Sequence, residues 1–235
     1  MAKCSPPPVQ HAFTLIELAV VIATIFILGA LTLRVSSGVV ERAKATKDMS
    51  NLRQIGIATQ TYMNDNNGVF PGSGSAIWMS QLELNLKYLS SWRVLESPFD
   101  KRSTSELGDG TTAVSYGINS NIYVSNVPIS VDKITKPTVF VVFAPAEASG
   151  ATVSFAGLAN SAAPGVKVLG TGSNTATSTP GGSATGGTHN SRTKINALFA
   201  DWHSETMVWA TFTNNAATGG DPDGELRWKP YTPYP

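Results

Sequence analysis

The sequence predicts an α+β protein in which a long N-terminal α-helix packs on a small antiparallel β-sheet domain. Two observations support this fold class. An apolar run from Phe13 to Leu33 leads into a helical pattern of apolar residues that continues to Asn64. Beyond residue 65, short segments rich in β-branched and aromatic residues alternate with Gly, Pro and Asn, a pattern typical of strands and turns. We therefore expect a helix over residues 13–64 and a globular domain over residues 65–235.

The first half of the expected helix has the composition of a membrane-spanning segment. The run FTLIELAVVIATIFILGALTL carries one charge, at Glu17, and about 20 helical residues cross the hydrocarbon core of a bilayer. A buried core helix usually shows a polar stripe, which this run lacks. A secretory signal peptide has its cleavage site after the apolar stretch, whereas the polar leader, residues 1–12, precedes this run. We predict a transmembrane segment at about residues 13–33.

The second half of the expected helix is amphipathic. Apolar residues such as Val39, Leu52 and Ile55 recur at spacings of three, four or seven, which places them on one face of a helix. The run Asn64–Asn67, followed by Gly68, is a stop signal. This half is predicted to pack on the globular domain, with its charged residues pointing in other directions: Arg42, Lys44, Lys47, Asp48 and Arg53.

The globular domain is predicted to contain one short helix and five short strands. The helix is expected at residues 78–88, where leucines follow helical spacing. Residues 157–188 are rich in Gly, Ala, Ser and Thr and are almost uncharged, so a long exposed loop is expected there. The strands are expected at residues 114–119, 122–127, 138–144, 195–200 and 205–212, the last two as an antiparallel pair.

Composition argues against several classes of protein. Lys plus Arg (17) nearly balance Asp plus Glu (16), which gives a net charge of +1. A nucleic-acid-binding protein usually has a strongly basic surface, so no nucleic acid partner is expected. The single cysteine, Cys4, cannot form an intramolecular disulfide or a multi-cysteine zinc site. The sequence contains no phosphate-binding loop, Gly-x-Ser-x-Gly elbow or His-Glu-x-x-His helix, and we expect no enzymatic activity.

The residues at the start of the apolar run form a specific motif. A short polar leader ends at Ala12, and Phe13-Thr14-Leu15-Ile16-Glu17 opens the long apolar helix. This pattern resembles the class III signal of type IV pilins and type II secretion pseudopilins, although Gly is usual at the position of Ala12. The resemblance implies a pilin-like lollipop fold, with the long helix as its stem.

The same resemblance implies a function and a set of partners. In that family a prepilin peptidase cleaves before the residue that corresponds to Phe13 and methylates the new N-terminus, and Glu17 pairs with the amine of Phe13 on a neighbouring subunit. We therefore expect a structural subunit of a type IV pilus-like or type II secretion pseudopilus filament. Its expected partners are copies of itself, other pilins or pseudopilins, prepilin peptidase, the inner-membrane assembly platform and membrane lipid. We expect a single-pass inner-membrane protein whose C-terminal domain is periplasmic, or extracellular in the filament.

Three further stretches are similar to a large bacterial group of pilin-like proteins. The first is the helix end from Asn51 to Pro71. The last, His189–His203, resembles a C-terminal element of His, nine residues and Asp-Gly, but eleven residues separate His189 from Asp201, and Trp202 replaces the Gly. Between them lie matches to shorter motifs of that group, with Ser97 where the group has Cys: Trp78, Leu82, Tyr88-Leu89, Ser97-Pro98-Phe99-Asp100 and Tyr116-Gly117-Ile118-Asn119.

Two polar clusters are candidate sites of another kind. In an extended segment Asp201 and His203 share one face, and His189 could join them in a metal or catalytic cluster, although hydrogen bonding at a turn explains them as well. Near the C-terminus, the acids of GGDPDGE offer oxygen ligands for calcium, although the EF-hand spacing is absent and a solvated turn is the alternative: Asp221, Asp223 and Glu225. The alternative function is a membrane-anchored periplasmic binding or enzymatic domain that uses the histidine cluster. Calcium is the one cofactor considered.

Overall fold

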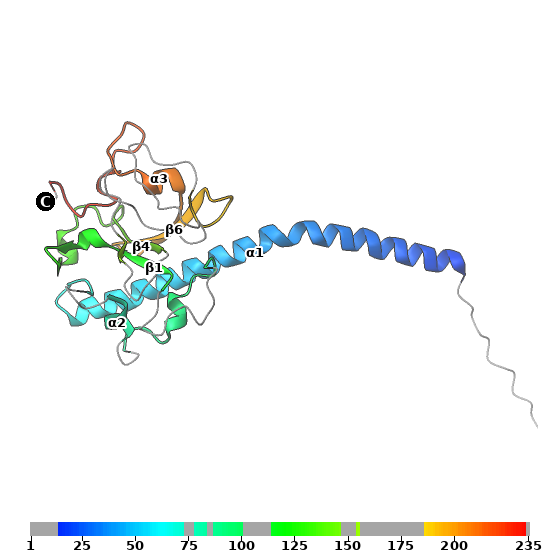
Figure 1. Cartoon of the computed structure of the whole chain (residues 1–235), viewed down its shortest axis with the longest axis horizontal. Coiled ribbons are helices and arrows are strands. Elements are labelled where there is room, and N and C mark those ends of the chain that lie inside the picture. Colours follow the sequence, from blue (N-terminus) through cyan, green and yellow to red (C-terminus); the bar gives the residue numbers. More distant parts are fainter. Residues whose placement is uncertain are drawn as a thin grey trace, which may run out of the picture. The chain divides into compact units, whose positions relative to one another are not determined.

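The computed structural model of the chain forms two compact units, Met1–Arg42 and Ala43–Pro235 (Figure 1). It describes residues 14–72, 78–83, 87–100, 114–146, 154–155 and 186–233, with the backbone alone for residues 31–37, 83 and 154–155. The expected leader, Phe13 and most of the expected loop at residues 157–188 lie outside these ranges.

The first helix, α1 (Leu15–Asp65), contributes residues to both units. It ends where the stop signal is expected. Asn67 and Gly68 adopt φ values of 55° and 75°, in the left-handed region, and the Gly68 N–H donates to the carbonyl of Met63 at 2.8 Å. This bond caps a carbonyl of the last turn, as in many helices that end on a left-handed residue.

The expectation of a membrane-spanning half of this helix is wrong for the part of the chain that the structure describes, in which no helix is long and apolar enough to cross a membrane.

The sheet is also not purely antiparallel as expected. Its strand order is β5-β1-β4-β6-β7, in which four strands pair antiparallel and the edge strand β5 pairs parallel with β1. A separate two-stranded sheet pairs β2 with β3. The strands are β1 (Tyr116–Asn119), β2 (Tyr123–Val124), β3 (Val127–Pro128), β4 (Val141–Pro145), β5 (Ser154–Phe155), β6 (Lys194–Phe199) and β7 (Ser204–Val208).

Helices cover both faces of this sheet. In Figure 1 the cyan part of α1 and the short helix α2 (Trp78–Glu83) lie on one side of β1, β4 and β6, and α3 (Trp209–Thr213) lies on the other. The core between these layers contains several fully buried large side chains, among them Phe70, Tyr116, Phe140, Phe143, Trp209, Phe212 and Trp228. Short 3₁₀ helices occupy Trp92–Leu95, Ser120–Ile122 and Val131–Lys133.

Close contact between α1 and the sheet depends on Gly56. A Cβ atom at this position would lie 3.0 Å from Cδ2 and 3.3 Å from Cδ1 of Leu198 on β6. The neighbouring residue Ile57, about 100° further around the helix, is 65% exposed and lies on an uncovered face. The backbone of α1 therefore approaches β6 more closely than a side chain at residue 56 would permit.

Three expected elements differ from those observed. The expected strand at residues 122–127 is a hairpin, because Ser125 and Asn126 adopt φ values of 52° and 63° and reverse the chain between β2 and β3. The expected strand at residues 205–212 becomes α3 after Val208, which places Trp209 and Phe212 three residues apart in the core. Helix α2 is described as far as Glu83, and residues 87 and 88 of the expected helix at residues 78–88 are not helical; residues 84–86 lie outside the described ranges.

Candidate functional site

The N-terminal end of α1 is closed by a reciprocal pair of hydrogen bonds. The Thr14 N–H donates to Oε2 of Glu17 at 2.9 Å, and the Glu17 N–H donates to Oγ1 of Thr14 at 3.3 Å. The Thr14 hydroxyl also donates to Oε2, at 2.8 Å. This arrangement is a capping box, in which both side chains satisfy N–H groups that the first helical turn leaves open. Within the described part of the chain, Oε1 of Glu17 has no hydrogen-bond partner.

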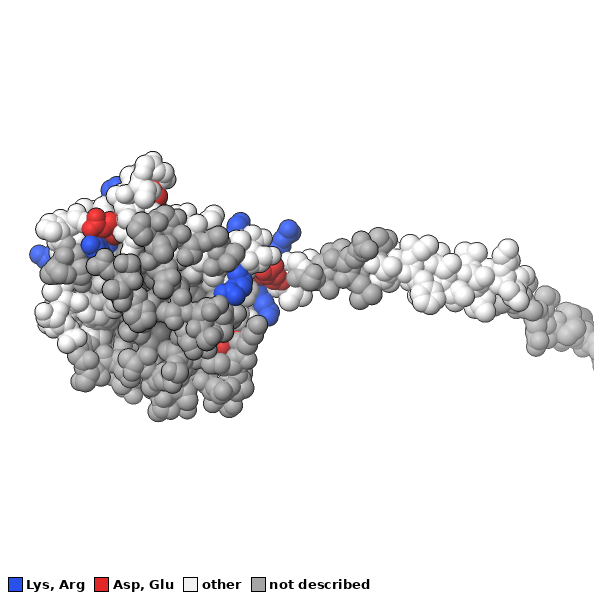
Figure 2. Space-filling model, turned by 45° about the horizontal axis from the view of Figure 1, so that its top comes forward, with Lys and Arg blue, Asp and Glu red and all other residues white. Residues whose placement is uncertain are grey.

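The helix that follows this cap has an uncovered apolar surface. Successive residues of a helix are about 100° apart, so the apolar side chains between residues 15 and 28 point in all directions around the axis. On the face that Figure 2 presents, the described part of this segment is mostly white, the colour of residues other than Lys, Arg, Asp and Glu. Large exposed apolar surfaces on soluble chains usually mark sites of interaction. Between half and nine-tenths of each of these side chains is exposed: Leu15, Ile16, Leu18, Val20, Val21, Ile22, Ile25, Phe26, Ile27 and Leu28.

The expected cluster of His189, Asp201 and His203 is only partly brought together. Nδ1 of His203 lies 2.5 Å from Oδ1 of Asp201, and the His203 ring stacks on Phe199. His189 lies at the other end of β6, where its backbone pairs with Lys194. The six residues of β6 span about 20 Å, so His189 is separated from the other two. Its buried ring instead stacks on Phe99 at a centroid distance of 5.4 Å.

The turn between β6 and β7 contains a residue in an unusual conformation. Trp202 has a φ of 70°, in the left-handed region that favours Gly, which is the residue that the pilin-like group has at this point of its C-terminal element. The Trp202 ring lies 6.3 Å from the ring of Phe70, and its Cε3 lies 3.5 Å from the Cβ position of Gly56. The left-handed backbone at Trp202 is strained for a residue other than Gly, and the packing of its indole against α1 is the contact that offsets this strain.

The three C-terminal acids each pair with a basic side chain of the protein. Asp221 receives two hydrogen bonds of 2.8 Å from the guanidinium of Arg227. Asp223 pairs with Lys136, and Glu225 pairs with Lys229. Within the described ranges, no group of three or more His, Cys, Asp or Glu side chains could hold a metal ion. The carboxylates proposed from sequence as calcium ligands point toward three different cations instead of one centre.

Replacing Arg227 with methionine should remove a pH-dependent part of the folding stability. Hydrogen bonds from Arg227 hold the pKa of Asp221 below its usual value of about 3.9. The pair therefore stabilises the fold above that pH, and this stabilisation is lost as the pH falls through the lower folded-state pKa. We expect the variant to be about 2 kcal/mol less stable than the wild type at pH 7, with a smaller difference at pH 2, both measured by urea unfolding.

The matched control for this experiment is Lys229→Met, which removes the more exposed pair with Glu225. Its effect should be below about 0.5 kcal/mol at either pH, since exposed ion pairs contribute little. An equal loss of stability in Arg227→Met at pH 7 and pH 2 would show that Arg227 acts through packing and not through the carboxylate.

The carboxylate of Asp48 on α1 is fully buried, at 0% exposure, and Asp48 is the one acidic residue among the buried polar residues that the structure describes. Oδ1 accepts hydrogen bonds from the hydroxyls of Ser97 at 2.6 Å and Tyr116 at 2.7 Å. Oδ2 accepts from Nδ2 of Asn196 on β6 at 2.8 Å. We call these residues, together with two neighbours in the same network, the Asp48 cluster: Asp48, Asn51, Ser97, Tyr116, Asn196 and Thr206.

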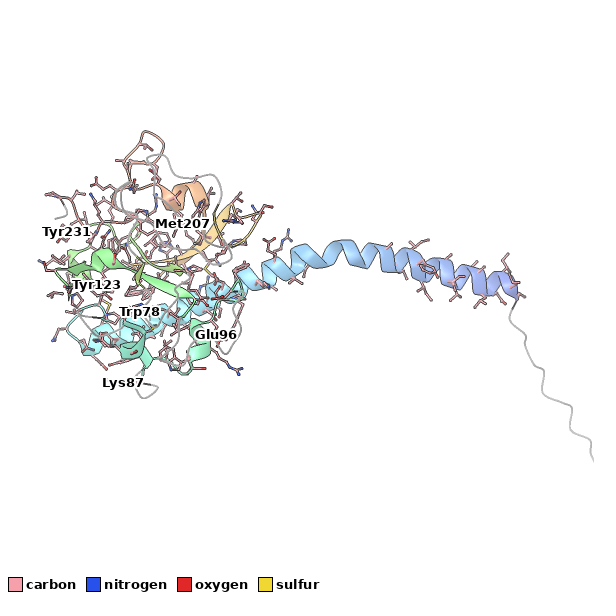
Figure 3. All side chains as sticks on the ribbon, in the orientation of Figure 1. Trp78, Lys87, Glu96, Tyr123, Met207 and Tyr231 are labelled. Carbon is pink, nitrogen blue, oxygen red and sulfur yellow. The ribbon has the colours of Figure 1, made fainter. Side chains whose placement is uncertain are left out.

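Hydrogen-bond directions in the Asp48 cluster are fixed by its outer members. Asn51 donates from Nδ2 to the hydroxyl oxygen of Tyr116 at 3.3 Å, so the Tyr116 proton is directed toward Asp48. The same Nδ2 donates to the backbone carbonyl of Glu96 at 2.8 Å; Glu96 is labelled beside α1 in Figure 3. The Thr206 hydroxyl donates to Oδ1 of Asn196 at 2.7 Å, which turns Nδ2 of Asn196 toward α1. Asp48 thus acts as the acceptor at the centre of the network.

Burial raises the pKa of the Asp48 carboxyl, while its three hydrogen bonds act in the opposite direction. The described residues include no ion-pair partner for it. Sequence reasoning placed Asp48 among the outward-pointing charged residues, and this is wrong. Asp48 precedes Leu52 by four residues and Ile55 by seven, so it belongs to the buried face, and this spacing was the signal that could have identified it.

The candidate sites differ in accessibility. The Asp48 carboxylate is enclosed by protein, and the C-terminal acids already have cationic partners. The apolar surface of residues 15–28 is open, and the pair of Asp201 and His203 is also exposed. Ala12 and Phe13, the expected processing site, lie outside the described ranges. No family model, curated protein or solved structure matches the chain.

Proposed function

We propose that the chain is a structural subunit of a type IV pilus-like or type II secretion pseudopilus filament, assembled through its N-terminal hydrophobic helix. The observation that carries the proposal is the combination of the Phe13–Glu17 motif with the exposed apolar surface that follows it. Because this surface surrounds the helix, a single partner on one side would leave much of it uncovered. Helices from several copies of the chain, packed around each other, would cover it on all sides.

Glu17 has a specific role in this proposal. Inside a bundle of apolar helices an ionised carboxylate needs a compensating charge, because its removal from water is costly. The amine of Phe13 on the next subunit would supply that charge after the leader is removed. Thr14 binds Oε2 of Glu17, so Oε1 is available to accept a hydrogen bond from the amine. This pairing would set the axial register between neighbouring subunits.

The proposal also specifies a cellular location and a set of partner proteins. Before assembly, the subunit would be held at the inner membrane with its sheet domain in the periplasm. Prepilin peptidase would cleave between Ala12 and Phe13 and methylate Phe13, and the inner-membrane assembly platform would then incorporate the subunit. A small residue at position 12 is consistent with cleavage at this peptide bond.

The experiment that tests the proposal is mass spectrometry of the chain purified from cells that contain a prepilin peptidase. The expected product begins at N-methylated Phe13. Ala12→Leu should block cleavage because the side chain is bulky, whereas Ala12→Gly should be processed at least as completely as the wild type. A wild-type chain that keeps Met1, or that is cut after residue 30, would rule out the proposed processing.

A further inference from the structure

The start of α1 in the second unit is attached to the sheet by polar groups. From Ala43 to Lys47 no side chain is buried, and the first buried side chains are those of Asp48 and Asn51. The first apolar side chain of α1 in the core is Leu52, at 0% exposure. Residues 43–51 are therefore held to the sheet mainly through hydrogen bonds of the Asp48 cluster.

Asn196 makes the central contact of this attachment. Its Nδ2 donates to the backbone carbonyl of Ala45 at 3.0 Å and to Oδ2 of Asp48 at 2.8 Å. One side chain of β6 thus holds two points of α1 that are almost one helical turn apart. The hydroxyls of Ser97 and Tyr116 hold the other oxygen of Asp48 from two further segments.

The following part of α1 is held in a different way. Between Leu52 and Met63, the side chains that face the sheet are mostly apolar and almost completely buried, and they include Leu52, Ile55, Ala58 and Met63. Separating this part from the sheet would expose apolar surface to water, which is costly in proportion to the area. Separating residues 43–51 would mainly exchange protein hydrogen bonds for water, and it would return the Asp48 carboxylate to solvent.

We infer that the Asp48 cluster is a latch: it closes residues 43–51 of α1 onto the sheet and can open while residues 52–65 remain packed. Opening moves the point at which α1 leaves the sheet by about two and a half helical turns, from residue 43 to residue 52. Because the open state keeps the apolar contacts of Leu52 and Ile55, it is a local opening and not global unfolding. The inference does not depend on the proposed function.

Thr206 offers a way to weaken the latch without disturbing the core. It lies on the edge strand β7 with an exposed side chain, and its hydroxyl holds the amide of Asn196 in the orientation that serves Asp48. Thr206→Val has nearly the same shape and lacks the hydroxyl. Thr206→Ser keeps the hydroxyl and is the matched control. Asn196→Ala removes both contacts to α1 and is the stronger variant.

The test is amide hydrogen exchange of the full-length chain in detergent micelles, followed by mass spectrometry of peptides covering residues 43–51 and residues 52–65. Thr206→Val should speed exchange in residues 43–51 roughly fivefold, and Asn196→Ala should speed it tenfold or more, as expected for one or more lost buried hydrogen bonds. Exchange in residues 52–65 should change by less than about twofold. Thr206→Ser should match the wild type.

Two results would overturn the inference. Equal acceleration in both peptides would mean that the Asp48 cluster belongs to one cooperative core that opens as a whole. Unchanged exchange in residues 43–51 of both Thr206→Val and Asn196→Ala would mean that these hydrogen bonds do not hold the segment. If Asn196→Ala fails to fold, the comparison between Thr206→Val and Thr206→Ser decides the question, because Thr206 lies outside the core.

Discussion

Replacing Glu17 with alanine should abolish filament formation while the sheet domain stays folded. The substitution removes the carboxylate that we propose as partner of the Phe13 amine, so an incoming subunit would bring an unpaired charge among apolar helices. It also removes one side of the capping box with Thr14, which affects the first helical turn by about 1 kcal/mol and does not reach the sheet. The measurement is the yield of sheared filaments, or of crosslinked ladders, from cells that express equal amounts of each chain.

Glu17→Gln separates the two roles of this side chain. Glutamine also serves in a capping box, so this variant keeps the hydrogen bond to Thr14 and loses the charge. We expect its filament yield to lie between those of the wild type and Glu17→Ala. A wild-type yield from Glu17→Gln would assign the effect to helix capping, and a wild-type yield from Glu17→Ala would show that the helices pack by apolar contact alone.

Gly56→Leu should destabilise the sheet domain by about 2–3 kcal/mol. The new side chain would have to occupy the space of Leu198 and Trp202, since a Cβ alone would lie 3.0 Å from the former and 3.5 Å from the latter. Overpacking of this kind usually costs about 1–3 kcal/mol, and separation of α1 from β6 would add lost apolar contact to that cost. The higher helix propensity of leucine offsets less than about 1 kcal/mol of this loss in the free energy of unfolding.

Urea unfolding followed by tryptophan fluorescence measures this loss. Ile57→Leu is the matched control, because it introduces the same side chain one residue away on the exposed face of α1. It should change the free energy of unfolding by less than about 0.5 kcal/mol. Gly56→Ala should lie near the wild type, since its gain in helix propensity is offset by the contact with Leu198. Equal stability of Gly56→Leu and Ile57→Leu would show that α1 does not approach β6 as closely as described.

Local pattern was sufficient to predict several elements of this fold. The β-branched and aromatic run at residues 138–144 overlaps β4, and the run at residues 195–200 overlaps β6, since apolar and β-branched residues fit the pleated surface of a buried strand. The change from β7 to α3 at Trp209 was not predictable in the same way. The run ETMVWATF has the composition of one continuous strand. A helical turn after Val208 instead places Trp209 and Phe212 on the same side, where both are buried in the core.

The candidate sites likewise divide into those that a local motif identifies and those that depend on tertiary packing. Glu17 could be identified as a candidate assembly residue from its motif. Its second role, in the capping box with Thr14, could also have been predicted, because Thr-x-x-Glu is the sequence signature of such a box. The Asp48 cluster could not be assembled from sequence, because its members come from five separate segments between residues 48 and 206. The separation of His189 from Asp201 likewise depends on how β6 is placed between them.

The distance along the chain between Asp48 and Asn196 constrains the order of events during synthesis. The two residues are 148 positions apart, and a ribosome adds about 5–20 residues per second. Asp48 is therefore added to the growing chain roughly 7–30 s before its partner on β6. During that interval its carboxylate remains hydrated, and the amphipathic half of α1 has no sheet to pack against. Packing of α1 on the sheet through Asn196 is thus a late event that requires β6 to have been made.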